Sequence, residues 1–233
     1  MARAATRAVR PAVADPAFHH FNRWRRDGVL DRLARAMRSR VDAAGLVAVL
    51  RRRHQRPCRG LRRRGAPGVP SRRGGGEPAD QALGRSRGGF GTKVHLLACG
   101  NAVPLDAVVT AGRAYERTVP APLLDGIGRR RRPAAVACDK GYDLPRVRRV
   151  PRARRLRAVI PEKRKPHGRR PGRPPVFDRD LYRRRNAVER CVGWLKQCRR
   201  VATRYEKLAV NFLAYVRLAM IRRYLHLLFS DRT

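Results

Sequence analysis

The sequence predicts a mixed α/β domain with helices before and after its sheet. Two observations carry this prediction. Between residues 92 and 161, short apolar runs typical of strands alternate with segments of helical period, which indicates a layered α/β sheet. From residue 178 onward, apolar residues recur at helical spacing. The chain has 233 residues, 42% of them apolar, which suits one domain or one domain with a short extension.

The first predicted region, residues 1–49, begins with a ragged basic stretch and continues as helix. In FHHFNRWRRDGVLDRLARAMRSRV (18–41), apolar side chains recur every three or four residues. Gly28 and Gly45 are the expected helix breaks. The Phe and Trp side chains at the start of this stretch could stack on bases, but packing within a small helical unit is the commoner outcome for such a stripe.

The second region, residues 50–76, has a different composition. From Ala43 to Gly76 there are ten arginines and no Asp or Glu, and the 50–76 stretch keeps no apolar period. Such a low-complexity segment predicts a disordered basic linker. The same composition would also suit a segment that follows a phosphate backbone.

The third region, residues 77–233, is predicted to hold the main α/β domain. The expected elements are a strand at 92–99, a strand at 103–110 after a Gly100-Asn101 turn, a helix near 122–127, a strand at 133–138, a helix at 144–152 and a strand at 156–161. A basic, Pro-rich loop at 163–178 could enter a DNA groove or extend into solvent. One long helix is expected from Asp178 to about residue 200, with the Asp178 carboxylate as its N-cap.

The charge of the chain is extreme, because 57 Lys and Arg residues face 17 Asp and Glu residues, for a formal net charge of +40. Such a chain repels itself unless a polyanion neutralises it, so nucleic acid is the expected partner. The plain alternative is a solvated Arg-rich chain whose composition reflects GC-rich codons.

The cysteines and the hydropathy of the chain indicate the cellular compartment to expect. The five cysteines show no CxxC spacing and no histidine lies near two of them, which argues against a zinc site or a disulfide framework. The N-terminus shows no apolar signal-peptide core. Arginines interrupt the apolar stretch 211–229, which predicts an amphipathic core helix. We therefore expect a cytoplasmic, nucleoid-associated protein with no membrane partner.

The stretch LYRRRNAVERCVGWLK (181–196) offers candidate chemistry. Tyr182, Arg185, Glu189 and Lys196 are spaced by three, four and seven residues, which places them within a narrow arc of one helix face. On spacing alone, Arg185 and Glu189 form an ordinary i,i+4 ion pair on a solvated helix.

Asp139 strengthens the chemical interpretation because it ends the apolar run PAAVAC, where a carboxylate is poorly solvated. An acid at a strand end and an acid on a helix, here Glu189, can converge on a hard cation such as Mg²⁺. Phosphoryl transfer uses such carboxylate-bound cations. In that site Arg185 and Lys196 would contact DNA phosphates, and Tyr182 would contact the backbone or stack.

These residues also carry a resemblance. Tyr182-x₂-Arg185-x₃-Glu189-x₆-Lys196 resembles the Y-R-E-K signature of a group of bacterial insertion-sequence transposases of the DDE class. Further stretches resemble that group in the expected order, over most of residues 17–228: FHHFNRWRRDG, EPADQALGRSRGGFGTKVHL, VVTAG, ACDKGYD, IPEK, GRPPVFD and ATRYEKLAV.

The resemblance implies an RNase H-like mixed sheet flanked by helices, with 77–233 as the catalytic domain. Asp139 matches the second catalytic acid and Glu189 the final one, so both are the implied metal ligands. Tyr182, Arg185 and Lys196 match the other members of the signature. The implied activity is cleavage of transposon ends and strand transfer with Mg²⁺ or Mn²⁺. The implied partner is double-stranded DNA, both transposon ends and target, and a homo-oligomeric assembly stays open.

Two departures from the family pattern qualify this. The N-terminal helical region looks truncated, so 1–49 is expected to be a remnant. The first catalytic Asp should lie on an apolar strand, yet no residue from 43 to 76 is acidic. Our hypothesis is a pair of compensating frameshifts, which would corrupt the first strand and cripple catalysis. The alternative is a genuine basic insertion, with Asp80 or Asp106 as the third ligand.

Two rival functions remain open at this point. One is a non-catalytic DNA-binding transposase remnant, which predicts binding without nicking. The other is a basic protein associated with RNA or the ribosome, which predicts no preference for DNA ends.

Overall fold

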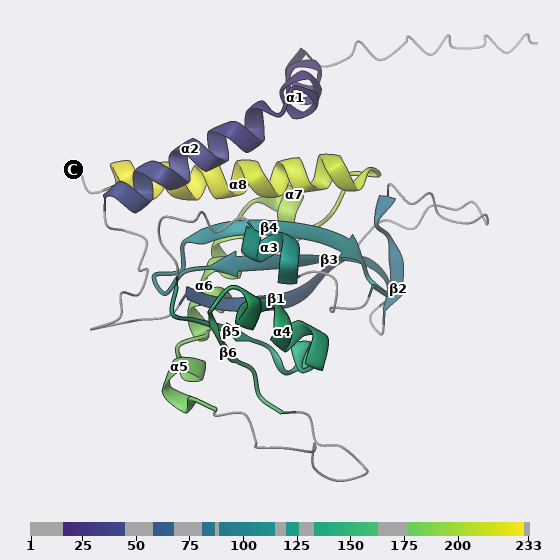
Figure 1. The fold of residues 1–233 in the computed structure, drawn as a ribbon. Coiled ribbons are helices and arrows are strands. Elements are labelled where there is room, and N and C mark those ends of the chain that lie inside the picture. Colours follow the sequence, from purple (N-terminus) through teal and green to yellow (C-terminus); the bar gives the residue numbers. More distant parts are fainter. Residues whose placement is uncertain are drawn as a thin grey trace, which may run out of the picture.

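A computed structural model describes residues 16–44, 58–67, 81–86, 89–114, 120–125, 133–162 and 177–230. Its helices are α1 (Pro16–Arg26), α2 (Val29–Ala43), α3 (Pro120–Asp125), α4 (Pro145–Ala153), α5 (Arg179–Arg183), α6 (Asn186–Lys196), α7 (Arg199–Ala202) and α8 (Ala209–Phe229), with a 3₁₀ turn, η3, at Lys140–Tyr142. Its strands are β1 (Cys58–Pro67), β2 (Gly84–Ser86), β3 (Gly89–Ala98), β4 (Pro104–Ala111), β5 (Ala135–Cys138) and β6 (Arg157–Val159). Mixed helix and sheet confirms the α/β prediction (Figure 1).

The six strands form one mixed sheet. Its order is β2-β3-β1-β5-β6, and β4 also pairs with β3. The antiparallel pairs join β3 to β1, β2 and β4, whereas β1–β5 and β5–β6 are parallel. The predicted hairpin is confirmed as β3 and β4. All four residues of β5 are buried, as expected for a strand covered on both faces.

The basic segment corrects the sequence-based expectation. The interpretation of residues 50–76 as an unstructured linker is wrong for 58–67, which form β1 near the centre of the sheet. The frameshift hypothesis expects a corrupted first strand, and the backbone of β1 nevertheless pairs with β3 and β5. Strand pairing uses backbone N–H and C=O groups. An Arg-rich segment whose sequence has no alternating apolar pattern can therefore still pair with the edges of β3 and β5. The stretches 50–57 and 68–76 lie outside the described residues.

Helices cover both faces of the sheet. α6 packs on β1 and β3, and α8 packs on α6 and β4. α3 and α4 pack against each other in front of the sheet in Figure 1, with α6 behind it. α2 lies alongside α8 and adds Ala34, Met37 and Val41 to the main core. The helical N-terminal segment therefore shares the core of the sheet domain.

The first helices follow the prediction closely. Gly28 separates α1 from α2 with φ of 66°, a left-handed conformation that suits glycine. The Phe and Trp side chains of α1 have different environments. Phe21 is buried and stacks on Tyr215, with ring centroids 4.4 Å apart. Phe18 and Trp24 are 43% and 48% exposed. Only part of that stripe packs as expected.

The long helix expected from residue 178 to 200 is interrupted. Asp178 caps α5 as predicted, because its Oδ1 accepts a hydrogen bond of 2.9 Å from the Leu181 amide. The chain then leaves the regular helix at Arg184 and Arg185, where the backbone forms i to i+3 bonds such as Val188 N to Arg185 O. Two helices, α5 and α6, therefore replace one.

The last helices pack as core helices. α8 buries Phe212, Val216 and Tyr224 in the main cluster, which agrees with the amphipathic prediction. No helix within the described ranges is long and apolar enough to cross a membrane. Arg204, between α7 and α8, is buried and donates to the carbonyls of Gln81, Glu206 and Lys207, which ties the start of α8 to the edge of the sheet.

Candidate functional site

The site is built at the carboxyl end of β5. Asp139 follows the buried strand directly, and its side chain is 25% exposed. The η3 turn comes next and is closed by a hydrogen bond of 2.9 Å from the Tyr142 amide to the Asp139 carbonyl. The Tyr142 hydroxyl lies 2.6 Å from Nδ1 of His95 on β3, and both side chains are fully buried. This contact anchors the turn that carries Asp139 to the central sheet.

A buried ion pair holds the other side of the turn. Nε of Arg148 donates to Oδ1 of Asp143 over 2.9 Å, and its Nη2 donates to the Ile160 carbonyl over 2.7 Å. Ile160 directly follows β6, so this guanidinium joins the ends of two neighbouring strands. Both charged side chains are almost completely buried, so each charge is stabilised by the other. This ion pair fixes the turn after β5 in place.

Arg185 joins the two acids that the sequence singled out. Its Nη1 lies 2.6 Å from Oδ1 of Asp139, and its Nη2 lies 3.8 Å from Oε1 of Glu189. The Nη1 atom is not aligned as a hydrogen-bond donor, so the shorter contact is an ion pair without directional bonding. The structure thus brings a strand-end acid and a helix acid together around one positive charge.

The other two signature residues differ in position. The Tyr182 ring lies 5.4 Å from the Arg185 guanidinium and packs on Phe177 at a centroid distance of 5.2 Å. Lys196 ends α6, is exposed, and follows Glu189 by seven residues, about 10 Å along the helix. Tyr182 therefore belongs to the acid cluster, and Lys196 lies apart from it.

The strand beside Asp139 carries no acid. In the parallel pairing of β1 with β5, Leu61 is opposite Cys138, so the next residues along the two strands are Arg62 and Asp139. β1 reads CRGLRRRGAP, which contains no Asp or Glu. Among the described residues no group of three metal-binding side chains occurs.

Asp106 does not replace the missing acid. It lies on β4, which β3 and β1 separate from β5, a distance of about 14 Å at normal strand spacing. It lines a separate cavity of about 370 Å³ between α2, α8 and β4, where burial raises the pKa of its carboxyl group. Asp80, the other candidate, lies outside the described residues.

The comparisons with known proteins decide the family. The family model described as "Transposase DDE domain" matches residues 66–222, more than half of the chain. The chain belongs to the DDE transposase family. A relative from Burkholderia cepacia, named "Putative transposase for insertion sequence element IS402", is 34% identical over 136 residues. That alignment covers 55% of this chain and 60% of the relative, so the chain spans less than two thirds of it. No solved structure matches the chain.

The residues of this DDE transposase fit one divalent cation better than two. Carboxylate oxygens are the ligands that Mg²⁺ and Mn²⁺ prefer, and Asp139 and Glu189 are each about a quarter exposed, open to a hydrated ion. The pair already attracts a cation, the Arg185 guanidinium. A second ion would need a third acid, and β1 offers none.

Three residues of this DDE transposase that shape the site were missed from the sequence: His95, Asp143 and Arg148. His95 sits inside an apolar strand, and Arg148 is one of several arginines in α4. Only Asp143, at the end of ACDKGYD, gave a usable signal, because an acid so close to a buried strand needs a partner.

Proposed function

We propose that this chain is the catalytic domain of an insertion-sequence transposase with an RNase H-like fold. The supporting arrangement is a mixed sheet with a central first strand, helices on both faces, one acid at a strand end and one on a packed helix. The observation that carries the proposal is the joining of Asp139 and Glu189 through Arg185. The boundaries 1–49, 50–76 and 77–233 become one unit with β1 inside the catalytic sheet.

In this proposal Asp139 and Glu189 hold one Mg²⁺ or Mn²⁺ ion. That ion, when bound, would stabilise negative charge on a phosphate oxygen and activate the attacking oxygen. Arg185 would then turn from the acids to a DNA phosphate, and the Tyr182 ring beside it would support the guanidinium. Exposed Lys196 would hold the DNA backbone further along α6. The substrate is double-stranded DNA, first the transposon end and then the target.

We further propose that cleavage by this copy is strongly reduced. Two acids remain where three are expected, and Arg62 follows the residue of β1 that pairs with Cys138. The same observation favours a second candidate function, a DNA-binding transposase remnant that occupies transposon ends without cutting them.

Nicking of supercoiled plasmid separates the two functions. The purified chain is incubated with plasmid in Mg²⁺, in Mn²⁺ and in a chelator, beside Asp139→Asn and Glu189→Gln. Asp180→Asn is the matched control, since that acid is 80% exposed and pairs with Arg183 across one helical turn. Weak, metal-dependent nicking that both site variants abolish and the control retains supports the enzyme. Tight DNA binding with no nicking in any condition supports the remnant.

A further inference from the structure

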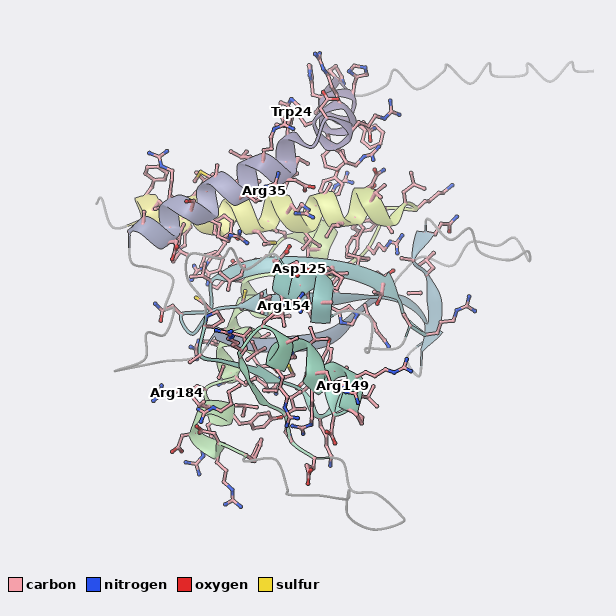
Figure 2. The ribbon with its side chains drawn as sticks, in the orientation of Figure 1. Trp24, Arg35, Asp125, Arg149, Arg154 and Arg184 are labelled. Atoms are coloured by element: carbon pink, nitrogen blue, oxygen red, sulfur yellow. The ribbon has the colours of Figure 1, made fainter. Side chains whose placement is uncertain are left out.

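An arginine stripe lies on the outer side of α4. Arg146, Arg149 and Arg152 are all exposed, and none pairs with an acid within the described part of the chain. Neighbouring arginines differ: Arg154 pairs with Asp125 and Arg157 pairs with Asp178 over 2.9 Å. Figure 2 shows Asp125 close to Arg154, and Arg149 on the outer side of its helix. The stripe therefore presents positive charge that the fold leaves available.

The helix holds the stripe outward for a structural reason. Val147, Arg148 and Pro151 form the buried side of α4. The stripe residues follow at intervals of three on the opposite side, so their Cα atoms span about 9 Å along the axis. A DNA strand carries one phosphate per about 3.4 Å of helix axis, so the stripe matches two or three successive phosphates.

The stripe begins close to Asp139 in sequence. α4 begins just after η3, which itself follows Asp139. The buried Asp143–Arg148 pair locks the first turn of α4 to the ends of β5 and β6. Arg146, the first residue of the stripe, therefore has a fixed position relative to the end of β5.

We propose that the arginine stripe binds the phosphate backbone of target DNA of arbitrary sequence. This rests on the proposed function, and it assigns target capture to a surface outside the Y-R-E-K residues. The exposed side of α4 offers guanidinium groups, which pair well with phosphate oxygens. Phosphate contacts position DNA without reading its sequence, which suits a target of arbitrary sequence.

The test measures binding to a duplex of about 30 base pairs with scrambled sequence, by fluorescence anisotropy over a range of KCl concentrations. The variant Arg146→Gln/Arg149→Gln/Arg152→Gln is expected to lower affinity about tenfold or more. The slope of log K against log salt should become shallower by up to about 2.7, or about 0.9 for each lost contact. Replacing the same three residues by lysine should retain most of the slope, because the positive charges remain.

The matched control removes three arginines from α2, where Arg32, Arg35 and Arg40 are likewise exposed on a helix. This control changes the net charge by the same amount but lies on the helical layer with α8, where Figure 2 labels Arg35. An equal loss in the control overturns the proposal, since binding would then follow net charge alone. Unchanged binding in the α4 variant also overturns it, as does a wild-type chain that does not bind the duplex.

A second duplex that carries the terminal sequence of the element distinguishes the two kinds of DNA. The α4 variant should lose affinity for the scrambled duplex and gain preference for the terminal one; a selective loss on the terminal duplex contradicts the assignment to target. Plasmid nicking reports separately on the proposed function. If the α4 variant binds DNA more weakly and the wild-type chain never nicks plasmid, the inference about α4 stands and the proposed enzymatic function fails. If the wild-type chain nicks plasmid with metal and the α4 variant binds DNA as tightly as the wild type, the function stands and the inference fails.

Discussion

The guanidinium of Arg185 lies 2.6 Å from the carboxylate of Asp139, which joins the turn before α6 to the end of β5. The same guanidinium reaches Glu189 at 3.8 Å. Its positive charge attracts both carboxylates. In the proposed function the same two acids would hold a divalent cation, which would compete with this guanidinium.

Removing this arginine should strengthen metal binding in the absence of DNA. We expect Arg185→Gln to bind Mn²⁺ about tenfold more tightly than the wild-type chain, equal to about 1.4 kcal/mol, because the competing charge is gone. Isothermal titration with Mn²⁺ measures this directly. Arg184→Gln is the matched control, because Arg184 is its exposed neighbour, labelled in Figure 2. Weaker Mn²⁺ binding in Arg185→Gln, or the same gain in the control, would contradict the competition.

Asp106 should make the stability of the chain depend on pH in a predictable direction. Burial raises the pKa of this carboxyl group above 3.8, although Arg217 and Arg38 act in the opposite direction. An acid with a raised folded-state pKa favours the folded state fully below its unfolded pKa, and that contribution is lost as the pH rises through the folded pKa. Ionised Asp106 therefore lowers the free energy of unfolding near neutral pH.

Asp106→Asn should remove this penalty. The Asn side chain keeps an oxygen that can accept the 2.8 Å hydrogen bond from the Ala107 amide. Urea unfolding at about pH 7 should show the variant more stable by up to about 1 kcal/mol. The difference should vanish as the pH falls below 3.8, the unfolded value. Asp180→Asn, an exposed acid, should show no such pattern, and a variant that is less stable at neutral pH would refute the assignment.

The sequence predicted those elements whose side chains carry a periodic apolar signal. The β3–β4 hairpin, β5, α4 and α8 lie close to their expected ranges, because burial of one face or both leaves its pattern in the sequence. β1 carries no such pattern, so it was not predicted; backbone pairing with β3 and β5 holds it in the sheet. The break between α5 and α6 was also missed, because Arg184 and Arg185 are ordinary helix formers and the turn comes from tertiary packing.

Asp139 and Glu189, the two acids singled out from the sequence, both lie near the Arg185 guanidinium, and their joint role at a metal stays a prediction. The position of Arg185 between them was not predicted. Its spacing to Glu189 suggested an i,i+4 pair, yet its shorter contact is to Asp139, which sequence spacing cannot show. Lys196 fits the spacing of the motif but lies apart from the acids, because seven residues along a helix return to the same face two turns away.

Arg62 provides the most direct test of the missing acid. It follows Leu61, the residue of β1 that pairs with Cys138, just as Asp139 follows Cys138. Arg62→Asp would put an acidic residue at the register position next to Asp139 and remove a positive charge. We expect plasmid nicking in Mn²⁺ to rise about tenfold or more over the wild-type chain.

Arg63→Asp is the matched control for this gain. It makes the same change of charge one residue further on, and consecutive residues of a strand point to opposite faces, so only one of the two positions can serve the acid pair. Nicking that rises equally in both variants would show an effect of charge alone. No gain in Arg62→Asp would contradict the register of β1 as the place of the lost acid. Resequencing the codons of 43–80 complements this test: a second reading frame that encodes an apolar strand with Val-Asp-Ser or Val-Asp-Thr would identify the frameshifts that removed the acid.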